Sequence, residues 1–176
     1  EKDYKLALEW WLKAADKDNE DSMNSIGNLY YKGKGVDQNY KLALAWWLKA
    51  ADKGCEDSMF SVGILYYDGE GTKKDYTIAL GWWFRAAAEG HEKSMFNIGK
   101  SYCKGKGVDQ DYKLALEWYK KSADKGYEDA MFNIGNLYYK GKGVDQNYKL
   151  ALEWWLKAGC KDSMFNIGNL YENGEG

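Results

Sequence analysis

The 176-residue chain has no proline, a single histidine and almost no net charge. The absence of proline removes the residue that most strongly interrupts α-helices. Its 25 basic and 27 acidic residues nearly balance and are interspersed, so the basic excess typical of nucleic-acid-binding proteins is missing. No apolar run approaches the roughly 20 residues that a membrane-spanning helix needs. We therefore expect neither a nucleic-acid partner nor a membrane span.

Cysteine is also scarce. Cys55, Cys103 and Cys160 are odd in number and widely spaced, which does not indicate a disulfide framework. The sequence has no Asn-x-Ser/Thr glycosylation acceptor either, and both absences slightly favour a reducing, cytoplasmic compartment. Because the chain begins with Glu1 rather than Met, we expect its true N-terminus to be missing, and the compartment stays open.

What the sequence does contain is a repeat. Tyr4 and Tyr40 lie 36 residues apart, as do Trp10 and Trp46, and further copies follow at the same step. Met164 breaks the step by coming three residues early. A spacing kept by many residue types at once indicates a unit copied about five times rather than biased composition.

One unit predicts two helices. The first is expected over 57–67, ending at Gly69, and the second over 76–89, ending at Gly90. The connecting loops, such as "GEGTKKD" and "GKGVDQN", end in Asp or Asn, which are favoured helix N-caps. A single helix pair cannot bury its apolar face, but stacked pairs can. The expected fold class is therefore all-α, an α-solenoid of about five 36-residue helix-turn-helix repeats.

The expected domain organisation is one repeat array over 1–176, cut in mid-repeat at both ends. Solenoid ends without a polar capping helix expose apolar surface, so end-to-end self-association is a further expectation. The segment "KAGCKDSM" is three residues shorter than its counterpart "KAADKGCEDSM". Three residues are most of a helical turn, so the last helix is expected to dock out of register or to follow a shortened partner.

The stretch "MFNIGNLYYKGKGVDQNYKLALEWWLKA" resembles the Sel-one-like repeat (SLR), a relative of the tetratricopeptide repeat. The residues that carry the resemblance are Ile134, Gly135, Tyr138, Gly141, Gly143, Ala151, Leu152, Trp154 and Trp155. Two departures are the missing loop proline and a second Trp where the family usually has Tyr. The resemblance implies a right-handed solenoid whose first helices line a concave, partner-binding side.

Little in the sequence predicts catalysis. His91 occupies a turn position equivalent to Cys55, which suggests a metal ligand, but equivalent residues lie one repeat apart, too far for metal bonds. A variable turn residue is the preferred interpretation. "GKGVD" lacks the Gly-Lys-Ser/Thr ending of a phosphate loop. Relatives linked to antibiotic hydrolysis carry paired cysteines in each repeat, and this chain does not. We expect no enzyme activity, no cofactor and no metal site.

The first helix of each repeat offers the candidate binding surface. Steps of 100° place Met59, Val62 and Gly63 in the core and leave a polar strip at Ser61 and Ile64. Asparagine side chains both donate and accept hydrogen bonds, so such a strip could hold a protein or an extended peptide. The alternative is that asparagine is simply tolerated there. The predicted partner-binding residues are Asn28, Asn97, Lys100, Asn133, Asn136, Asn166, Tyr31, Tyr67 and Tyr139.

Paired tryptophans mark the second helix of most repeats, as at Trp10 and Trp11. Both are expected to pack in the core. The second becomes Tyr119 in one copy, where the next position becomes Lys120, so the second is expected to lie nearer solvent if either does. Because aromatic residues make up 16% of the chain, carbohydrate binding by exposed rings is the alternative function.

Overall fold

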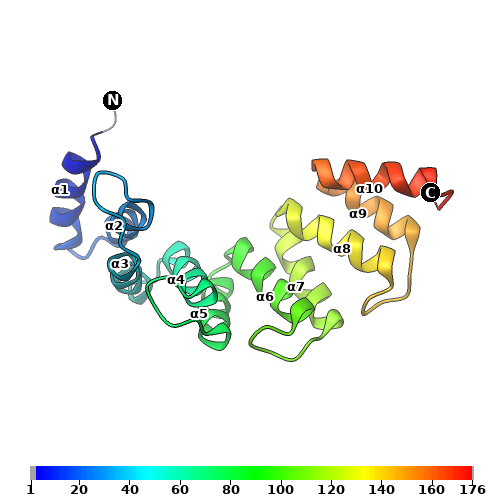
Figure 1. Ribbon diagram of the computed structural model, residues 1–176, viewed down its shortest axis with the longest axis horizontal. Helices are drawn as coiled ribbons and strands as arrows, with labels where there is room; N and C mark the ends of the chain where they lie inside the picture. Colours follow the sequence, from blue (N-terminus) through cyan, green and yellow to red (C-terminus); the bar gives the residue numbers. More distant parts are fainter. Residues whose placement is uncertain (1–2, 176) are drawn as a thin grey trace. The chain divides into compact units, whose positions relative to one another are not determined.

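The computed structural model describes residues 3–175 and is built from α-helices joined by short turns (Figure 1). No β-strand occurs within these residues. The helices are α1 (Tyr4–Ala15), α2 (Glu20–Lys32), α3 (Tyr40–Asp52), α4 (Glu56–Asp68), α5 (Tyr76–Ala88), α6 (Glu92–Lys104), α7 (Tyr112–Asp124), α8 (Glu128–Lys140), α9 (Tyr148–Ala158) and α10 (Lys161–Glu172). The predicted helix pair at 57–67 and 76–89 is confirmed to within one residue at each end.

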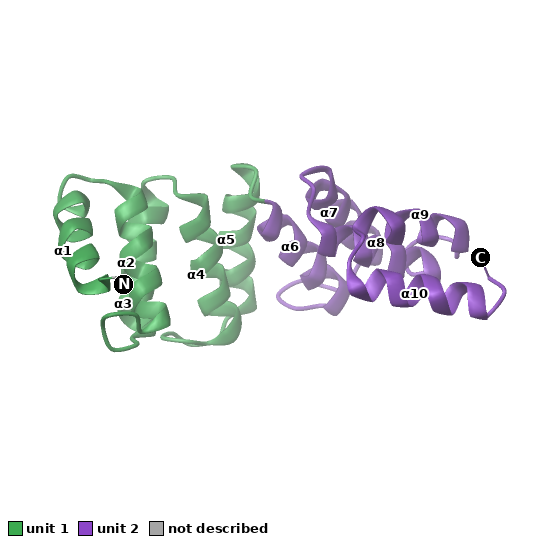
Figure 2. Ribbon diagram, turned by 90° about the horizontal axis from the view of Figure 1, so that it is seen from above, with its two compact units in different colours: residues 1–91 green, residues 92–176 purple. Residues whose placement is uncertain are grey.

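The helices fall into two compact units, Glu1–His91 and Glu92–Gly176 (Figure 2). We call the first helix of each repeat the A helix (α2, α4, α6, α8 and α10) and the second the B helix (α1, α3, α5, α7 and α9). In unit 1, α2 packs against α3 and α4 against α5, and α3 also contacts α4. Unit 2 repeats this arrangement, with α6 against α7, α8 against α9, and α7 in contact with α8.

Helix ends follow the predicted caps. Each B helix is preceded by Asp or Asn, and in α5 the Oδ1 atom of Asp75 accepts a hydrogen bond of 2.9 Å from the Ile78 amide. The A helices α2, α4 and α8 end at a glycine in the left-handed region, such as Gly69 with φ of 77°, whereas α10 ends at Asn173. The second loop glycine has a further role: a Cβ atom at Gly71 would lie 2.6 Å from the Tyr40 backbone carbon. The loop therefore rests on the start of the preceding B helix.

The relative burial of the two tryptophans in each pair differs from the expectation. The second tryptophan is the buried one, with Trp47 and Trp83 only 3% and 1% exposed, whereas Trp10 is 62% exposed and Trp46 is half-buried. The prediction that the second ring lies nearer solvent is wrong. The change to Tyr119 does not mark an exposed position, because Tyr119 is itself buried.

The shortened last repeat is accommodated in its B helix. Helix α9 has 11 residues, whereas α3, α5 and α7 each have 13. It ends early at Gly159, which has φ of 61° and donates its backbone N–H to the carbonyl of Trp155. The predicted shortened partner of the final helix is confirmed. None of the helices in 3–175 has both the length and the apolar character of a membrane span.

Candidate functional site

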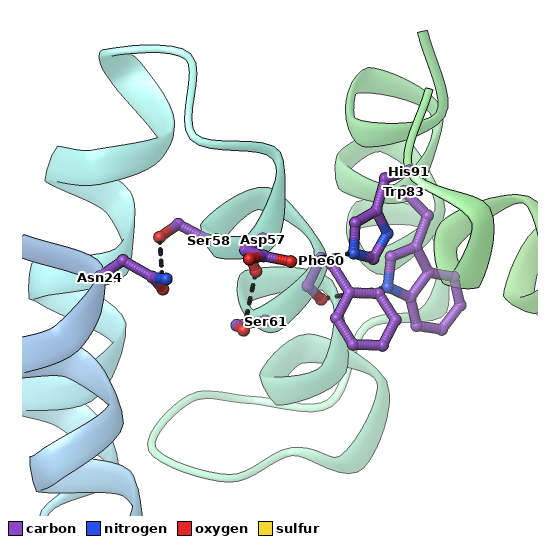
Figure 3. Close-up of polar contacts among 7 residues, drawn as sticks. All are labelled: Asn24, Asp57, Ser58, Phe60, Ser61, Trp83 and His91. Carbon is purple, nitrogen blue, oxygen red and sulfur yellow. Dashed lines mark hydrogen bonds and ion pairs between the residues drawn. The ribbon is translucent and has the colours of Figure 1, made fainter. Parts of the chain in front are cut away.

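In three repeats the second tryptophan packs against the A helix of its own repeat and lies beneath the surface of that helix, namely Trp47, Trp83 and Trp155. In unit 1 the Trp83 indole lies against α4, and its Nε1 donates a hydrogen bond of 3.2 Å to the Phe60 carbonyl (Figure 3). Trp47 does the same against α2, with Nε1 at 3.3 Å from the Asn24 carbonyl. Both rings approach the A helix at a glycine, where a side chain would collide with them. The indole ring therefore packs directly against the A-helix backbone, with no side chain between them.

The predicted tyrosines stand beside these tryptophans. The Tyr31 ring centroid lies 5.3 Å from that of Trp47 and 5.4 Å from that of Tyr40. Tyr67 and Tyr139 make the same two contacts in their own repeats. All three are half-buried, so they both hold the tryptophan in place and present an edge to solvent. Burial, with the charge of Glu70 as a second cause, raises the pKa of Tyr31.

One repeat replaces this aromatic pair with a smaller one. Cys103 stands where Tyr31 stands in its repeat, and Tyr119 stands where Trp47 does. The Tyr119 hydroxyl and the Cys103 thiol form a hydrogen bond. Burial raises the pKa of both groups. The two substitutions thus belong to one local exchange of packing partners.

Two clefts open on the A-helix face, one in each unit. Cleft 1, with a volume of about 160 Å³, is lined by Asn28, Tyr31, Lys32, Trp47, Phe60, Ser61 and Ile64. Cleft 2, also about 160 Å³, is lined by Asn136, Tyr139, Lys140, Trp155, Asn166 and Asn169. Each cleft lies between consecutive A helices and has the second tryptophan as its floor. Apart from Phe60, whose counterpart Phe165 does not line cleft 2, their residues occupy equivalent repeat positions, so the clefts are two versions of one feature.

The asparagine strip is only partly the ladder that the sequence predicted. Asn166 on α10 donates a hydrogen bond of 3.2 Å from Nδ2 to Oδ1 of Asn136 on α8, which links two neighbouring A helices. Asn133, in contrast, turns its Nδ2 to the Asp129 carbonyl of its own helix, at 2.7 Å. A link that the sequence did not reveal joins Ser58 Oγ to Oδ1 of Asn24 at 2.9 Å (Figure 3).

The predicted site residues are therefore distributed unevenly. All nine are half-buried. The structure brings five of them into clefts, namely Asn28 and Tyr31 in cleft 1 and Asn136, Tyr139 and Asn166 in cleft 2. The other four are Asn97 and Lys100 on α6, Asn133 on α8 and Tyr67 on α4.

Sequence reasoning missed the two lysines and the tryptophan floor of the clefts. Lys32 and Lys140 occupy the last position of their A helices, where a lysine also interacts favourably with the helix dipole. The recurrence of lysine before the glycine cap was the available signal for them. Trp47 and Trp155 were assigned only to the core, because a helical wheel cannot show that a buried ring also forms the bottom of a cleft.

His91 differs from the variable turn residue that was expected. It directly precedes α6 but is only 7% exposed. Its Nε2 lies 3.2 Å from Oδ1 of Asp57, and its ring stacks 4.8 Å from the Phe60 ring (Figure 3). His91 thus fastens the end of the α4–α5 pair. Residues 3–175 contain no group of three or more His, Cys, Asp or Glu side chains able to hold a metal ion.

The first residue of the aromatic pair in each B helix is a tryptophan that is less buried than the aromatic residue after it, although Trp46, Trp82 and Trp154 still pack partly against core residues. In every copy a cationic side chain three residues later covers the ring, at 4.3 Å from the centroid for Lys49 over Trp46. Such contacts are typically worth about 0.5–1 kcal/mol at exposed sites. The pairs are Lys13 with Trp10, Lys49 with Trp46, Arg85 with Trp82, Lys121 with Trp118 and Lys157 with Trp154.

Stacked helix pairs, glycine-capped A helices and clefts between repeats define an α-helical solenoid repeat protein. More narrowly, the chain belongs to the Sel1 repeat family, which matches residues 1–19, 20–55, 56–91, 92–127, 128–163 and 161–176. The SLR resemblance drawn from the sequence is thereby confirmed. A search of curated protein sequences found no significant match.

Solved structures agree with this assignment. A protective antigen of uropathogenic Escherichia coli with an SLR fold is 31% identical, with a TM-score of 0.91 over 94% of this chain, which spans 36% of that protein. A Sel1 repeat protein from Oxalobacter formigenes is 31% identical, with a TM-score of 0.87, over 96% of this chain and 70% of that one. Cysteine-rich protein B of Helicobacter pylori is 23% identical, with a TM-score of 0.58, over 70% of this chain and 94% of that one, and shares the fold. In the present chain all three cysteines are free.

Proposed function

We propose that this chain is a non-enzymatic interaction module that binds an extended segment of a partner protein along its A-helix face. Sel1 repeats generally mediate protein interactions, and proteins built from them are generally non-catalytic scaffolds. The observation that carries the proposal is the pair of equivalent clefts. Both clefts have a tryptophan at the bottom and a tyrosine at one side, but the residues contributed by the second A helix differ. We expect this pattern if the shared aromatic residues maintain the fold and the variable residues contact a ligand.

The size of these two clefts favours a peptide side chain over a cofactor as their occupant. Small-molecule and cofactor sites typically enclose about 300–1,000 Å³. Each cleft here encloses about 160 Å³, which suits a single amino-acid side chain. Cleft 1 is lined from α2, α3 and α4 and cleft 2 from α8, α9 and α10, so each unit offers one site of this size.

The polar groups at the clefts suit a peptide backbone. Asn28 and Asn136 occupy the same position on α2 and α8, and their amides can pair with both the N–H and the C=O of a bound main chain. Lys32 and Lys140 add a donor at the same edge of each cleft. Hydrogen bonds of this kind recognise an extended chain without depending on its sequence.

The test uses peptides selected from a random displayed library against the wild-type chain, with affinity measured by fluorescence anisotropy. The block variant Asn97→Ala, Asn133→Ala, Asn136→Ala and Asn166→Ala leaves the net charge unchanged. We expect it to bind the selected peptides at least tenfold more weakly, while its thermal melt by circular dichroism stays close to that of the wild type.

A matched control alters four exposed residues on the B helices. The variant Lys41→Ala, Glu117→Ala, Lys149→Ala and Glu153→Ala removes two positive and two negative charges from B-helix positions that line neither cleft. It should bind the peptides as the wild type does. Equal affinity of the asparagine block variant and the wild type would remove the asparagine strip from consideration as the binding surface.

A further inference from the structure

The two clefts share a floor but differ in the chemistry of one lip. At the positions where cleft 1 has Ser61 and Ile64, cleft 2 has Asn166 and Asn169. We infer that cleft 1 is a subsite for an aliphatic side chain of a bound peptide, whereas cleft 2 is a subsite for an amide side chain. This inference rests on the proposed function and adds the specificity of the two subsites to it.

Cleft 1 presents apolar side chains at its floor and on its α4 wall, while Asn28 and Lys32 line its α2 side. Trp47 forms the floor, and Phe60 and Ile64 line the wall contributed by α4. The remaining α4 residue, Ser61, donates its hydroxyl proton to the Asp57 carbonyl of its own helix at 2.8 Å. An aliphatic side chain placed here would leave water without losing a hydrogen bond, and burial of its methyl groups would favour binding.

Cleft 2 presents amide groups on the same side. The bond from Asn166 Nδ2 to Asn136 Oδ1 uses one donor and one acceptor of this pair. The Asn136 amide N–H groups and the Asn166 carbonyl oxygen keep hydrogen-bonding capacity, and Asn169 adds a further amide at the lip. An amide side chain of the ligand can both donate to and accept from such groups. An aliphatic side chain would bury them without partners, which costs binding free energy.

Size does not distinguish the clefts. Both enclose about 160 Å³ and both are walled by a tyrosine, Tyr31 in cleft 1 and Tyr139 in cleft 2. Leucine and asparagine side chains have nearly the same branched outline, so a preference between them reports polarity rather than fit. The side chains at positions 64 and 169 are therefore the specificity-determining residues of this inference.

The experiment uses three small probes: N-acetyl-leucine N-methylamide, N-acetyl-asparagine N-methylamide and the alanine analogue as the backbone control. The reporters are the assigned indole N–H resonances of Trp47 and Trp155 in the ¹⁵N-labelled 176-residue chain, since each ring is the floor of one cleft. We expect the leucine probe to shift the Trp47 resonance, and the asparagine probe to shift the Trp155 resonance. At each indole, the preferred probe should produce the same shift at a concentration about tenfold lower than the other probe needs. The alanine probe should shift both resonances only weakly.

Reciprocal substitutions provide the second measurement. Ile64→Asn should give cleft 1 the preference of cleft 2, and Asn169→Ile should do the reverse. Both positions are half-buried lip residues, and melting curves check that each variant folds. Equal response of both indoles to both probes in the wild type overturns the inference, as does the absence of any shift up to the solubility limit. Preferences that stay unchanged in folded swap variants overturn it too.

The outcome is separable from that of the proposed function. Suppose that selected peptides bind the asparagine block variant more weakly, while the leucine and asparagine probes shift both indole resonances equally. The proposed peptide-binding function is then supported and the two distinct subsites are refuted. If the probes discriminate between the clefts but the block variant keeps its affinity for selected peptides, the two subsites are supported and the role proposed for the asparagine strip in peptide binding is refuted.

Discussion

The indole ring of Trp83 occupies the space in which a side chain at Gly63 would lie. A Cβ atom on Gly63 would be 2.5 Å from Cδ1 of Trp83, closer than non-bonded carbon atoms approach. Gly27 and Gly135 meet Trp47 and Trp155 at the same distance. These glycines lie inside A helices, where glycine has a conformational cost relative to alanine. The close approach of a rigid, buried ring is what requires them.

Gly63→Ala should therefore lower the free energy of unfolding by about 1–3 kcal/mol, since over-packing a filled core forces side chains or backbone to shift. The control is Gly81→Ala in α5, where an added Cβ meets nothing within 4 Å. That exposed helical position should gain about 0.5–1 kcal/mol. Urea unfolding followed by circular dichroism measures both. A Gly63→Ala variant as stable as Gly81→Ala would contradict this account of the contact.

Much of this fold could be predicted from the sequence because local chemistry fixes it. Capping residues such as Asp75 and Gly69 mark helix ends through hydrogen bonds and backbone angles that depend on a few neighbouring residues. The 36-residue step fixed the number and order of the helices in the same way. The shortened α9 also followed from a count of residues alone.

The candidate site was less predictable because it depends on contacts between helices. A helical wheel places Trp46 and Trp47 on one apolar arc, and only the position of α2 decides that Trp47 is the buried ring. Likewise, the wheel exposes Asn133 and Asn136 alike, yet one amide bonds to its own helix and the other to the next A helix. Which asparagines share a cleft is a property of helix packing, not of spacing.

The paired exchange at Cys103 and Tyr119 predicts energetic coupling. In the other repeats a tyrosine packs against the indole of the second tryptophan. Cys103→Tyr alone supplies that tyrosine but leaves the smaller Tyr119 ring in place of the indole. Tyr119→Trp alone supplies the indole but leaves Cys103 in place of the tyrosine. Making both changes restores the pair found in the other repeats. We expect the double variant to be more stable than the sum of the single changes by at least about 0.5 kcal/mol, as residues in contact typically couple. A cycle of Cys103→Tyr with the distant, exposed Tyr171→Phe should be additive.

Alkaline pH should destabilise the protein through the half-buried Tyr127. Burial, with Asp129 as a second cause, raises the pKa of Tyr127 to about 12, compared with about 10 in an unfolded chain. Below pH 10 both states hold this proton. As the pH rises from 10 towards 12 the unfolded chain loses it first, so the free energy of unfolding falls. Tyr127→Phe should make this fall shallower, measured by urea unfolding between pH 9 and 11.5 and normalised to pH 8. An unchanged slope would show that Tyr127 does not contribute.

Tryptophan fluorescence should separate the two members of each pair. Trp46→Phe should lower the fraction of emission that acrylamide quenches, because Trp46 reaches solvent beside Lys49. Trp47→Phe should leave that fraction no smaller and should remove blue-shifted emission, because Trp47 is buried against α2. The reverse pattern would mean that the second ring is the exposed one.

The contact between an A-helix glycine and a B-helix indole also has a genetic consequence. Gly27 and Trp47, like Gly63 and Trp83, belong to the same repeat, so one copied segment of the gene encodes both partners. Unequal recombination that adds or deletes a whole repeat leaves each such contact complete, and no compensating mutation is needed in a neighbouring repeat. Copy number can therefore drift between lineages, while a change confined to one glycine or one indole breaks its own repeat.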